Sequence, residues 1–264
     1  MEKLYIIKIG GNIIDNPVEL DSFLRQFSAI DGYKILIHGG GKLTTEIAEK
    51  AGIKQTLIDG RRITDAETLK IAVMVYAGWI NKSITAKLQA LNCNAIGLSG
   101  ADANMITAEK CKHPSIDFGF VGDILPDGIR SKSIIQLLES DFILVFCAVT
   151  HNGKGQLLNT NADTMASALA VALSNDFEVS LVFCFEKNGV LADANDDSSL
   201  IPELSVSDYE ALKQKGIVTK GMIPKLDNAF NARKLNVQNV MIGNASQLAQ
   251  IISKQKDAAT YILN

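Results

Sequence analysis

The chain has 264 residues and a mass of 28.5 kDa, and its 47% hydrophobic and 21% charged residues are typical of a globular protein with a sizeable buried core. Its 26 Lys and Arg residues against 29 Asp and Glu residues give a net charge of -3, which excludes a broad positive field for binding nucleic acid or an anionic membrane. No apolar run reaches membrane-spanning length. The cysteines are far apart and form no C-x-x-C pair, so we expect buried thiols in a cytoplasmic protein: Cys93, Cys111, Cys147 and Cys184.

The first predicted element is a buried strand that begins at Leu4 and carries a single cation, Lys8. Strands this short and apolar are typical of parallel sheets covered on both faces, whose ligands bind beyond the carboxyl ends of the strands. Gly10 and Gly11 follow, and their lack of a Cβ lets the backbone bring N–H groups close to an anion. Taken alone, the stretch fits equally well a lysine that extends from a strand end into a glycine turn.

A second strand and a second glycine loop follow a helix predicted over 18–30. The strand is predicted over Lys34–His38, and Gly39–Gly41 separate it from a helix over 42–51. Such a loop presents unpaired N–H groups at a helix N-terminus, where anions bind. Its spacing matches neither the phosphate-binding loop nor the dinucleotide fingerprint, in which Thr44 would have to be glycine. The loop is therefore either an anion site or a flexible turn.

The next cation of interest is Arg62, which precedes a long helical pattern over 66–91. The helix dipole opposes a cation near a helix start, which favours a function for Arg62, such as binding a ligand carboxylate through two hydrogen bonds. A solvated loop arginine is the alternative. We then expect a third strand within 94–102, and hairpins over 106–128 at an edge of the sheet, as a candidate lid over the site.

A helix is predicted over 133–138 and a fourth strand over 142–149. The stretch Leu158–Asp163 follows, and another helix is predicted over 164–173. Asn161 is a natural N-cap, and an acid in the first turn is favoured by the helix dipole. Capping alone would therefore explain both residues.

A second lobe is predicted from Val179 onward. Lys225 follows Pro224 near the N-terminus of a helix that continues to Leu235, and a cation in that position indicates an anionic partner. The remaining predicted elements are a strand over 181–185, an exposed acidic loop over 193–199, a helix over 207–214, a strand over 237–243, a helix over 247–253 and a strand over 261–263.

Five motifs, in this order along essentially the whole chain, resemble the amino acid kinase family. The pairing of G-x-R-x-T with N-x-N-A-D is most similar to the members that act on N-acetyl-L-glutamate, rather than to those that act on carbamate, aspartate, glutamate or uridylate. The motifs are Lys8-Ile9-Gly10-Gly11, His38-Gly39-Gly40-Gly41, Gly60-Arg61-Arg62-Ile63-Thr64, Asn159-Thr160-Asn161-Ala162-Asp163 and Gly221-Met222-Ile223-Pro224-Lys225.

The resemblance implies one domain over 1–264, a three-layer αβα sandwich with a largely parallel, eight-stranded open sheet. Residues 1–176 would form the lobe that binds the acyl amino acid, and residues 177–264 the lobe that binds the nucleotide. The implied reaction is ATP-dependent phosphorylation of the γ-carboxylate of N-acetyl-L-glutamate, in arginine biosynthesis, with Mg²⁺ carried by ATP and not by protein side chains. The family pattern also implies a homodimer. Feedback inhibition by arginine goes with an extra N-terminal helix in this family, and because the first strand here begins by Leu4, we expect the enzyme to be insensitive to arginine.

The family pattern gives three residues catalytic roles. Lys8 and Lys225 would bracket the transferring phosphoryl group, and Asp163 would orient the two lysines. The chemistry agrees, because the accepting carboxylate is already ionised, so the transfer needs positioned cations and N–H donors more than a base.

The other implied site residues bind substrates. Gly40 and Gly41 would contact the acceptor, and Arg62 and Asn159 would hold the acylated glutamate. The residues expected at the phosphates and the nucleotide are Gly10, Gly11, Glu186, Lys187, Asn188, Gly189, Val190, Leu191, Ile217, Val218 and Thr219.

Three other functions stay open at this point. A kinase for another N-acylated glutamate, such as N-succinylglutamate, would use the same Arg62 and Asn159 contacts. A non-catalytic amino-acid sensor could share the fold, although it would not need all three of the catalytic residues. A dinucleotide-dependent dehydrogenase is disfavoured by the failed glycine fingerprint.

Overall fold

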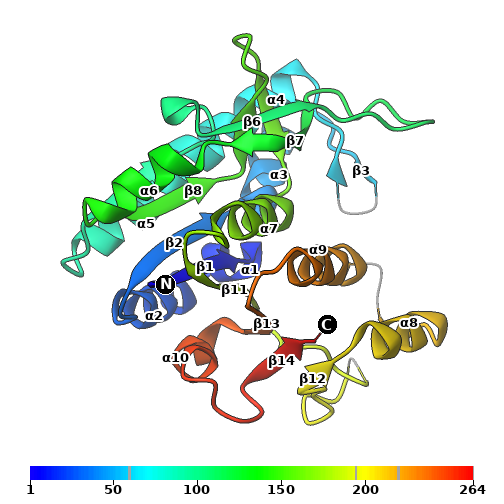
Figure 1. Ribbon diagram of the computed structural model, residues 1–264. Coiled ribbons are helices and arrows are strands. Elements are labelled where there is room, and N and C mark those ends of the chain that lie inside the picture. Colours follow the sequence, from blue (N-terminus) through cyan, green and yellow to red (C-terminus); the bar gives the residue numbers. More distant parts are fainter. Residues whose placement is uncertain (59–60, 194, 219–220, 264) are drawn as a thin grey trace.

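An eight-stranded sheet runs through the whole molecule (Figure 1), and the computed structural model describes residues 1–264 apart from 59–60, 194, 219–220 and 264. Neighbouring strands are parallel except for one antiparallel pair, β13 with β14, so the predicted largely parallel sheet is confirmed. In spatial order the strands are β12 (Glu203–Leu204), β14 (Ala259–Ile262), β13 (Asn239–Asn244), β11 (Glu178–Phe185), β1 (Lys3–Ile9), β2 (Tyr33–His38), β8 (Ile143–Cys147) and β5 (Ala95–Leu98).

The central strand β1 is buried on both faces. Leu4 and Ile6 belong to one hydrophobic cluster, while Ile7 and Ile9 belong to another, because successive residues of a strand point to opposite faces. Lys8 follows the same alternation, so its side chain extends from the face that Leu4 and Ile6 occupy. Since β1 pairs with β11 along its whole length, one sheet joins the two predicted lobes, and the boundary between 176 and 177 stays a proposal.

Helices cover both faces of this sheet, which confirms the three-layer αβα arrangement (Figure 1). The face of Leu4 and Ile6 is covered by α6 (Ser131–Glu139), α7 (Ala162–Leu173), α8 (Val206–Gln214) and α9 (Ile223–Lys234). The opposite face is covered by α1 (Gly11–Asp15), α2 (Pro17–Ser28), α3 (Gly41–Lys50), α4 (Ala66–Val73), α5 (Asn81–Gln89) and α10 (Leu248–Ile252).

The long helix predicted over 66–91 is present, but its middle changes type. Between α4 and α5 the residues Met74–Ile80 form a π-helical segment, η1, with wider hydrogen-bond spacing. Asp65 caps the start, because its side chain accepts a hydrogen bond of 2.7 Å from the Thr68 N–H group.

The hairpins predicted at an edge of the main sheet are elsewhere. Strands β6 (Ile106–Lys110) and β7 (Val121–Ile129) form a small closed barrel with β9 (Val149–His151) and β10 (Leu157–Thr160). The prediction was wrong because β9 and β10 supply the pairing partners instead of the edge strand β5. The polar Asn159 and Thr160 hid β10, which we had expected only as the approach to a helix.

A short hairpin of β3 (Leu57–Ile58) and β4 (Arg61–Arg62) was not predicted. Arg62 lies in β4, and α4 begins four residues later, at Ala66. The helix dipole therefore does not disfavour a cation at Arg62, and this part of the prediction was wrong. The described residues also form two short 3₁₀ segments, η2 (Asp102–Asn104) and η3 (Ala245–Gln247).

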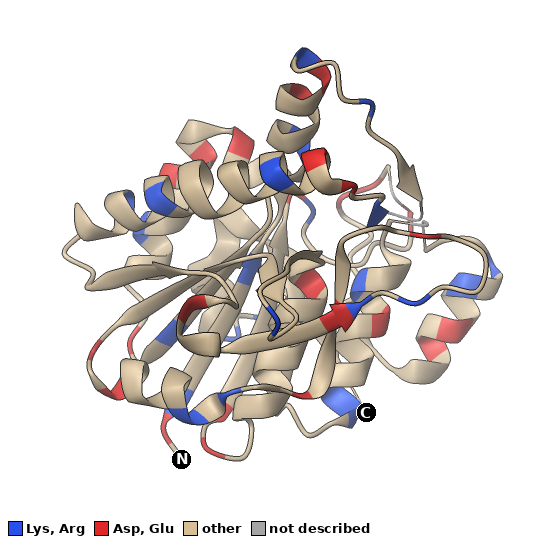
Figure 2. Ribbon diagram, turned by 90° about the horizontal axis from the view of Figure 1, so that it is seen from above, with Lys and Arg blue, Asp and Glu red and all other residues tan. Residues whose placement is uncertain are grey.

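Charged residues of both signs are interspersed along the helices and loops (Figure 2). In the described part of the chain, no helix is long and apolar enough to cross a membrane. Local groups of charges therefore matter more than any overall field.

Candidate active site

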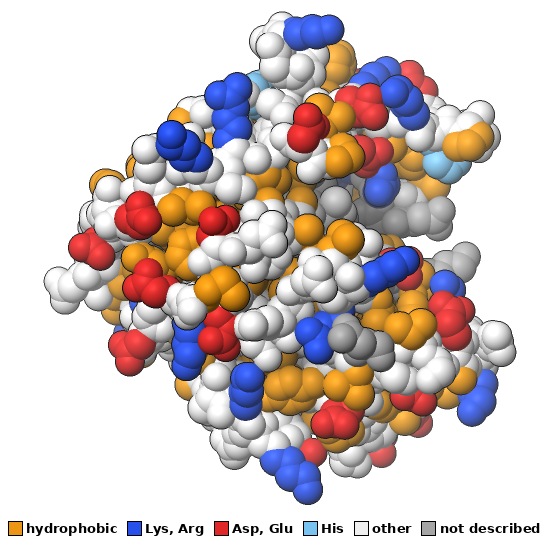
Figure 3. Space-filling view, in the orientation of Figure 1, with side chains coloured by type: hydrophobic (Ala, Val, Ile, Leu, Met, Phe, Trp, Pro, Cys, Tyr) orange, Lys and Arg blue, Asp and Glu red, His pale blue; other side chains and the backbone are white. Residues whose placement is uncertain are grey.

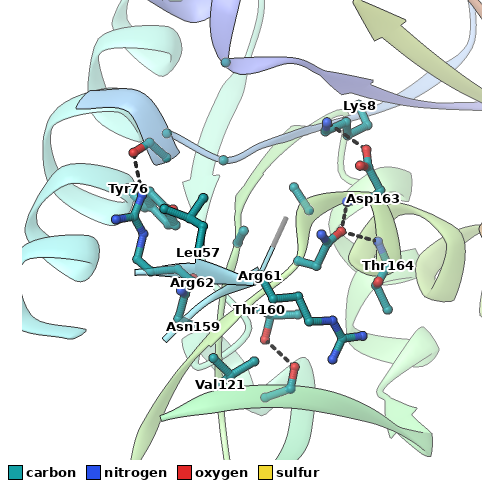
Figure 4. A pocket seen from close by; sticks show the side chains of 18 of the residues that line it. Lys8, Leu57, Arg61, Arg62, Tyr76, Val121, Asn159, Thr160, Asp163 and Thr164 are labelled. Atoms are coloured by element: carbon teal, nitrogen blue, oxygen red, sulfur yellow. Dashed lines mark hydrogen bonds and ion pairs between the residues drawn. The ribbon is translucent and has the colours of Figure 1, made fainter. Parts of the chain in front are cut away.

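Two lysines from distant parts of the chain meet one carboxylate. The Nζ atom of Lys8 lies 2.7 Å from Oδ1 of Asp163, and Nζ of Lys225 donates a hydrogen bond of 2.7 Å to Oδ2 of the same residue. Lys8 lies near the carboxyl end of β1, while Asp163 and Lys225 lie in the first turns of α7 and α9. The structure thus brings together the three residues predicted to be catalytic, two of which are labelled in Figure 4.

The cap of α7 fixes the position of Asp163. The side-chain oxygen of Asn161 accepts hydrogen bonds from the N–H groups of Asp163, at 2.8 Å, and Thr164, at 3.0 Å. Asn161 is therefore the predicted N-cap. Asp163 itself caps nothing, and its carboxylate is directed at the two lysines.

Burial and charge act in opposite directions on these groups. Burial by itself raises the pKa of Asp163, but the attraction of Lys8 and Lys225 outweighs it and lowers that pKa to about 2. Burial and the nearby Lys225 lower the pKa of Lys8, against the attraction of Asp163. Burial also acts to lower the pKa of Lys225, but Asp163 outweighs it and the pKa is raised. At neutral pH, Asp163 is therefore ionised and Lys225 is protonated.

A cavity of about 210 Å³ opens beside Lys8, and the residues that line it lie between positions 8 and 164 of the chain. It contains all four predicted substrate-binding residues, and Figure 4 shows Arg62 on the opposite wall from Lys8 and Asp163. The lining residues are Lys8, Ile9, Gly11, Gly39, Gly40, Gly41, Leu57, Arg61, Arg62, Tyr76, Val121, Gly122, Asp123, Ala148, Asn159, Thr160, Asn161, Ala162, Asp163 and Thr164.

The glycine loop at the start of α3 is closely packed, not a flexible turn. A Cβ atom added to Gly40 would collide with Ile80 and lie 3.0 Å from a ring carbon of Tyr76, both in η1. His38 holds the loop in place. Its Nδ1–H group donates a 2.8 Å hydrogen bond to the Gly39 carbonyl, and its Nε2 atom accepts one from the side-chain amide of Asn81. Burial lowers the pKa of His38 to about 4, so the ring is neutral in this role.

Arg62 is buried and largely committed to neighbouring residues. One of its amino groups donates hydrogen bonds of 2.7 Å to the Gly41 carbonyl and 2.8 Å to Oγ1 of Thr45, and the other donates to Oε1 of Gln55. A guanidinium has five N–H donors, so two remain for a ligand. Asn159 lines the same cavity and donates to Oγ1 of Thr64 at 3.1 Å.

The two glycines after β1 differ in what they offer a ligand. The N–H group of Gly10 donates a 3.0 Å hydrogen bond to the Cys184 carbonyl, which extends the pairing of β1 with β11. Gly10 therefore cannot offer that group to an anion, contrary to the prediction. Gly11, at the first position of α1, lines the cavity.

A second cavity, of about 360 Å³, is lined by residues between 185 and 225, among them Lys225, which binds Asp163. Figure 3 shows the surface hollowed where β3 faces α8 and α9. Most residues predicted at the nucleotide line this cavity, but Asn188 does not, because its side-chain oxygen accepts a 3.2 Å hydrogen bond from Asn244. Thr219, like Gly60 and Lys220, lies outside the described residues. The lining residues are Phe185, Glu186, Lys187, Gly189, Val190, Leu191, Ile217, Val218, Gly221, Met222 and Lys225.

Sequence reasoning missed several residues of the first cavity. Tyr76 lies within a helix, where nothing in the pattern distinguishes it from a core residue. Val121, Gly122 and Asp123 come from β7, whose pairing partners were predicted wrongly. Arg61 is next to a predicted site residue and was given no function. The described residues contain no group of three or more His, Cys, Asp or Glu side chains that could hold a metal ion.

Comparisons with known proteins agree with the predicted resemblance, which they confirm. The model of the amino acid kinase family matches residues 3–244. The acetylglutamate kinase of Cytophaga hutchinsonii is 52% identical over 264 residues, which are 100% of this chain and 99% of that protein. The acetylglutamate kinase of Parabacteroides distasonis is 47% identical over 250 residues, 95% and 97% of the two chains. The structure of a carbamate kinase from Giardia lamblia has a TM-score of 0.66 and 15% identity over 100% of this chain and 98% of that one, which shows the fold.

The lowered pKa of Asp163 predicts a pH-dependent contribution to stability. The carboxylate has a pKa near 3.8 when unfolded and about 2 when folded, so its contribution is full above pH 4 to 5 and is lost as the pH falls towards 2. Urea unfolding of the wild type and of Asp163→Asn should therefore give a free-energy difference that is constant from pH 7 to 5. That difference should then shrink by about 2 kcal/mol by pH 2.

A surface acid provides the control. Glu67 pairs with Lys70 in the exposed first turn of α4, and we expect Glu67→Gln to differ from the wild type by a small amount throughout this range. If the difference for Asp163→Asn stayed constant down to pH 2, the two lysines would not be stabilising the charged form of Asp163.

Proposed function

The chain belongs to the amino acid kinase family, and on that premise we propose that it transfers the γ-phosphoryl group of ATP to the γ-carboxylate of N-acetyl-L-glutamate. The products are N-acetylglutamyl 5-phosphate and ADP, and the reaction belongs to arginine biosynthesis. The observation that carries the proposal is the position of Lys8, Asp163 and Lys225. Lys8 and Asp163 line the first cavity, Lys225 lines the second, and one carboxylate joins them.

The transfer brings two anions together, so cations have to be in place before the substrates meet. A γ-carboxylate oxygen attacks the γ-phosphorus as the bond to the ADP oxygen breaks, and no proton has to be removed from the acceptor. Lys8 lines the first cavity, which would hold the acceptor, and Lys225 lines the second, which would hold the phosphoryl donor. Both can therefore neutralise charge on the phosphoryl oxygens during transfer. Asp163 is a positioning residue in this mechanism, because it aims both ammonium groups and keeps Lys225 protonated.

The first cavity fits the acylated glutamate. Gly40 and Gly41 line the same cavity as Lys8, so their backbone groups are the ones we assign to the reacting carboxylate. The two remaining N–H donors of Arg62, together with Asn159, are the groups we assign to the α-carboxylate.

The second cavity fits a nucleotide. Val190, Leu191 and Met222 give it apolar walls, while Lys225 lines it and also binds Asp163 of the first cavity. Since Asp163 is occupied by two lysines, we propose that Mg²⁺ arrives on the ATP phosphates. Bound there, the ion would neutralise phosphate charge.

We also propose a cytoplasmic homodimer. The four cysteines are free and buried, as expected of a protein in a reducing compartment. The side chains of Met74 and Trp79 in η1 are 62% and 70% exposed, and large exposed apolar side chains that lie close together are typical of subunit interfaces.

A coupled assay of ADP release tests the function directly. With ATP and Mg²⁺, we expect turnover that depends on N-acetyl-L-glutamate and is far slower with free L-glutamate, because the free amine adds a positive charge where the acyl group should lie. Binding of N-acetyl-L-glutamate without ADP release would indicate a sensor and contradict the proposal.

The two lysines should contribute to turnover more than to binding. We expect Lys8→Ala and Lys225→Ala each to lower kcat by roughly 10²–10³, with smaller changes in KM, by analogy with the loss of one preorganised transition-state donor. Lys70→Ala, which removes an exposed lysine of α4, is the matched control. Near-normal kcat in either active-site variant would refute the two-lysine mechanism.

Arg62 should act on substrate binding. Loss of a charge-assisted hydrogen bond predicts that Arg62→Ala raises the KM for N-acetyl-L-glutamate by roughly 10- to 100-fold, with a smaller change in the KM for ATP. Arg25→Ala removes an exposed arginine of α2 and serves as the control. An unchanged KM for the amino-acid substrate would exclude Arg62 from the site.

A further inference from the structure

Tyr76 lines the first cavity and has no function in the mechanism above. It belongs to the π-helical segment η1, and its side chain is buried. Figure 4 shows Tyr76 beside Arg62, on the wall opposite Lys8 and Asp163. Short π-helical segments within α-helices occur frequently at functional sites, so a side chain that such a segment brings to a cavity is a candidate for ligand binding.

The ring of Tyr76 has a structural role. A Cβ atom added to Gly40 would lie 3.0 Å from one carbon of the ring and 3.1 Å from another, so the ring packs directly against the glycine loop. A phenylalanine ring would make the same contact. The packing therefore accounts for the ring of Tyr76 but not for its hydroxyl group.

The hydroxyl lies close to the guanidinium of Arg62. A Cβ atom added to Gly41 would be 3.9 Å from the hydroxyl oxygen of Tyr76 and 3.7 Å from Nη2 of Arg62, so both atoms lie within 4 Å of one point on the cavity wall. Burial raises the pKa of Tyr76, against the attraction of Arg62. At neutral pH the hydroxyl is therefore protonated and has a hydrogen to donate.

The described residues offer this hydrogen no acceptor at normal hydrogen-bond length and angle. Arg62 cannot accept it, because a guanidinium has donors only. Thr44 is the other neighbour that affects Tyr76, but it is fully buried in α3, and its Oγ1 atom also has no hydrogen-bond partner in the described part of the chain. Leaving a buried donor without a partner is costly, and a ligand in the cavity would remove that cost.

The α-carboxylate of the substrate is the acceptor that fits this position. It is assigned to the unused N–H donors of Arg62, so it has to lie next to the guanidinium, where the Tyr76 hydroxyl also lies. A carboxylate has about four lone-pair sites and can accept from both residues at once. A tyrosine hydroxyl adds a donor there without adding a second positive charge beside Arg62.

We propose that the hydroxyl of Tyr76 donates a hydrogen bond to the α-carboxylate of the acylated glutamate, next to Arg62. The ring of Tyr76 then supports the glycine loop, and the hydroxyl completes the carboxylate site. The inference rests on the proposed kinase function and adds a residue to the part of the site that recognises the amino-acid substrate.

Two substrates that differ only at the α-carboxylate test the inference. N-acetyl-L-isoglutamine has a neutral carboxamide in place of the α-carboxylate of N-acetyl-L-glutamate, and both keep the γ-carboxylate that accepts the phosphoryl group. We expect Tyr76→Phe to lower kcat/KM for N-acetyl-L-glutamate by roughly 10- to 100-fold, because a hydrogen bond to a charged group is lost. The loss for the carboxamide should be roughly 10-fold smaller, since a hydrogen bond to a neutral acceptor is weaker.

The effect of Tyr76→Phe should lie in the KM for the amino-acid substrate. We expect kcat and the KM for ATP to change little, because the phenylalanine ring still supports Gly40. A displaced glycine loop would instead lower kcat for both substrates. Equal losses of kcat/KM for the two substrates would show that the hydroxyl does not recognise the α-carboxylate, and would contradict the proposal.

Tyr261→Phe is the matched control variant. The hydroxyl of Tyr261 is also buried without a partner among the described residues, but Tyr261 lies in β14 and lines neither of the two cavities. We expect this variant to keep the wild-type kinetics with both substrates. If it lost as much as Tyr76→Phe, the loss would not come from the cavity, and Tyr76 would not be a binding residue.

Thr44→Val tests the alternative partner of the Tyr76 hydroxyl. Valine keeps the shape of Thr44 and removes its hydroxyl, and we expect the KM for N-acetyl-L-glutamate to stay close to the wild-type value. If Thr44→Val raised that KM as much as Tyr76→Phe does, the Tyr76 hydroxyl would serve to hold α3, and the proposed bond to the substrate would be wrong.

Wild-type turnover separates failure of this inference from failure of the proposed function. ADP release with N-acetyl-L-glutamate, together with a Tyr76→Phe variant that behaves like the wild type, would refute the role of Tyr76 and leave the kinase function standing. Binding of N-acetyl-L-glutamate without ADP release would refute the kinase function. Dissociation constants of the same variants for the two compounds, measured by titration calorimetry, would then decide the role of Tyr76.

Discussion

The carboxylate of Asp163, held between the ammonium groups of Lys8 and Lys225, is the interaction on which the site depends. Removing either kind of partner from a buried ion pair leaves an uncompensated charge, so the three residues are constrained as a unit. They come from β1, α7 and α9, and the first and last are more than two hundred residues apart in the chain. The fold therefore has to bring one strand end and two helix starts to the same point.

The sheet provides this geometry. Because β1 lies at the centre of the sheet, between β2 and β11, the end of β1 faces elements from both halves of the chain. Strand alternation directs Lys8 to the face covered by α7 and α9, and both helices begin at the same edge as the strand ends. Lys8 and Asp163 line the first cavity and Lys225 lines the second, and a residue displaced by one position in β1 would face the opposite layer.

Local sequence patterns predicted individual strands and helix starts of this arrangement. Apolar runs identified the strands of the main sheet except the two-residue β12, and the cap at Asn161 and the proline before Lys225 located two helix starts. The resemblance between the five motifs and a known family supplied the long-range connections. Convergence of Lys8 with Lys225 could not be derived from spacing, since no periodicity relates residues in different elements.

The wrong predictions have a common physical cause: the sequence does not specify which strands pair with each other. Gly10 offers no N–H group because β11 takes it, and β11 is far away in the chain. The barrel was placed at a sheet edge because β10, with its polar Asn159 and Thr160, carries no apolar alternation. An error about β7 then hid Asp123, and without Asp123 nothing distinguished Arg61 from a solvated loop arginine.

Arg61 and Arg62 show how one short hairpin can place two consecutive arginines in different surroundings. Arg62 is buried and its bonds to Gly41 and Thr45 tie it to the start of α3, so it cannot move far without disturbing the glycine loop. Arg61, on the opposite side of the same strand, is half exposed and held by a single acid, so its environment can change at little cost in stability. The alternation of a two-residue strand is sufficient to place both arginines at the same cavity.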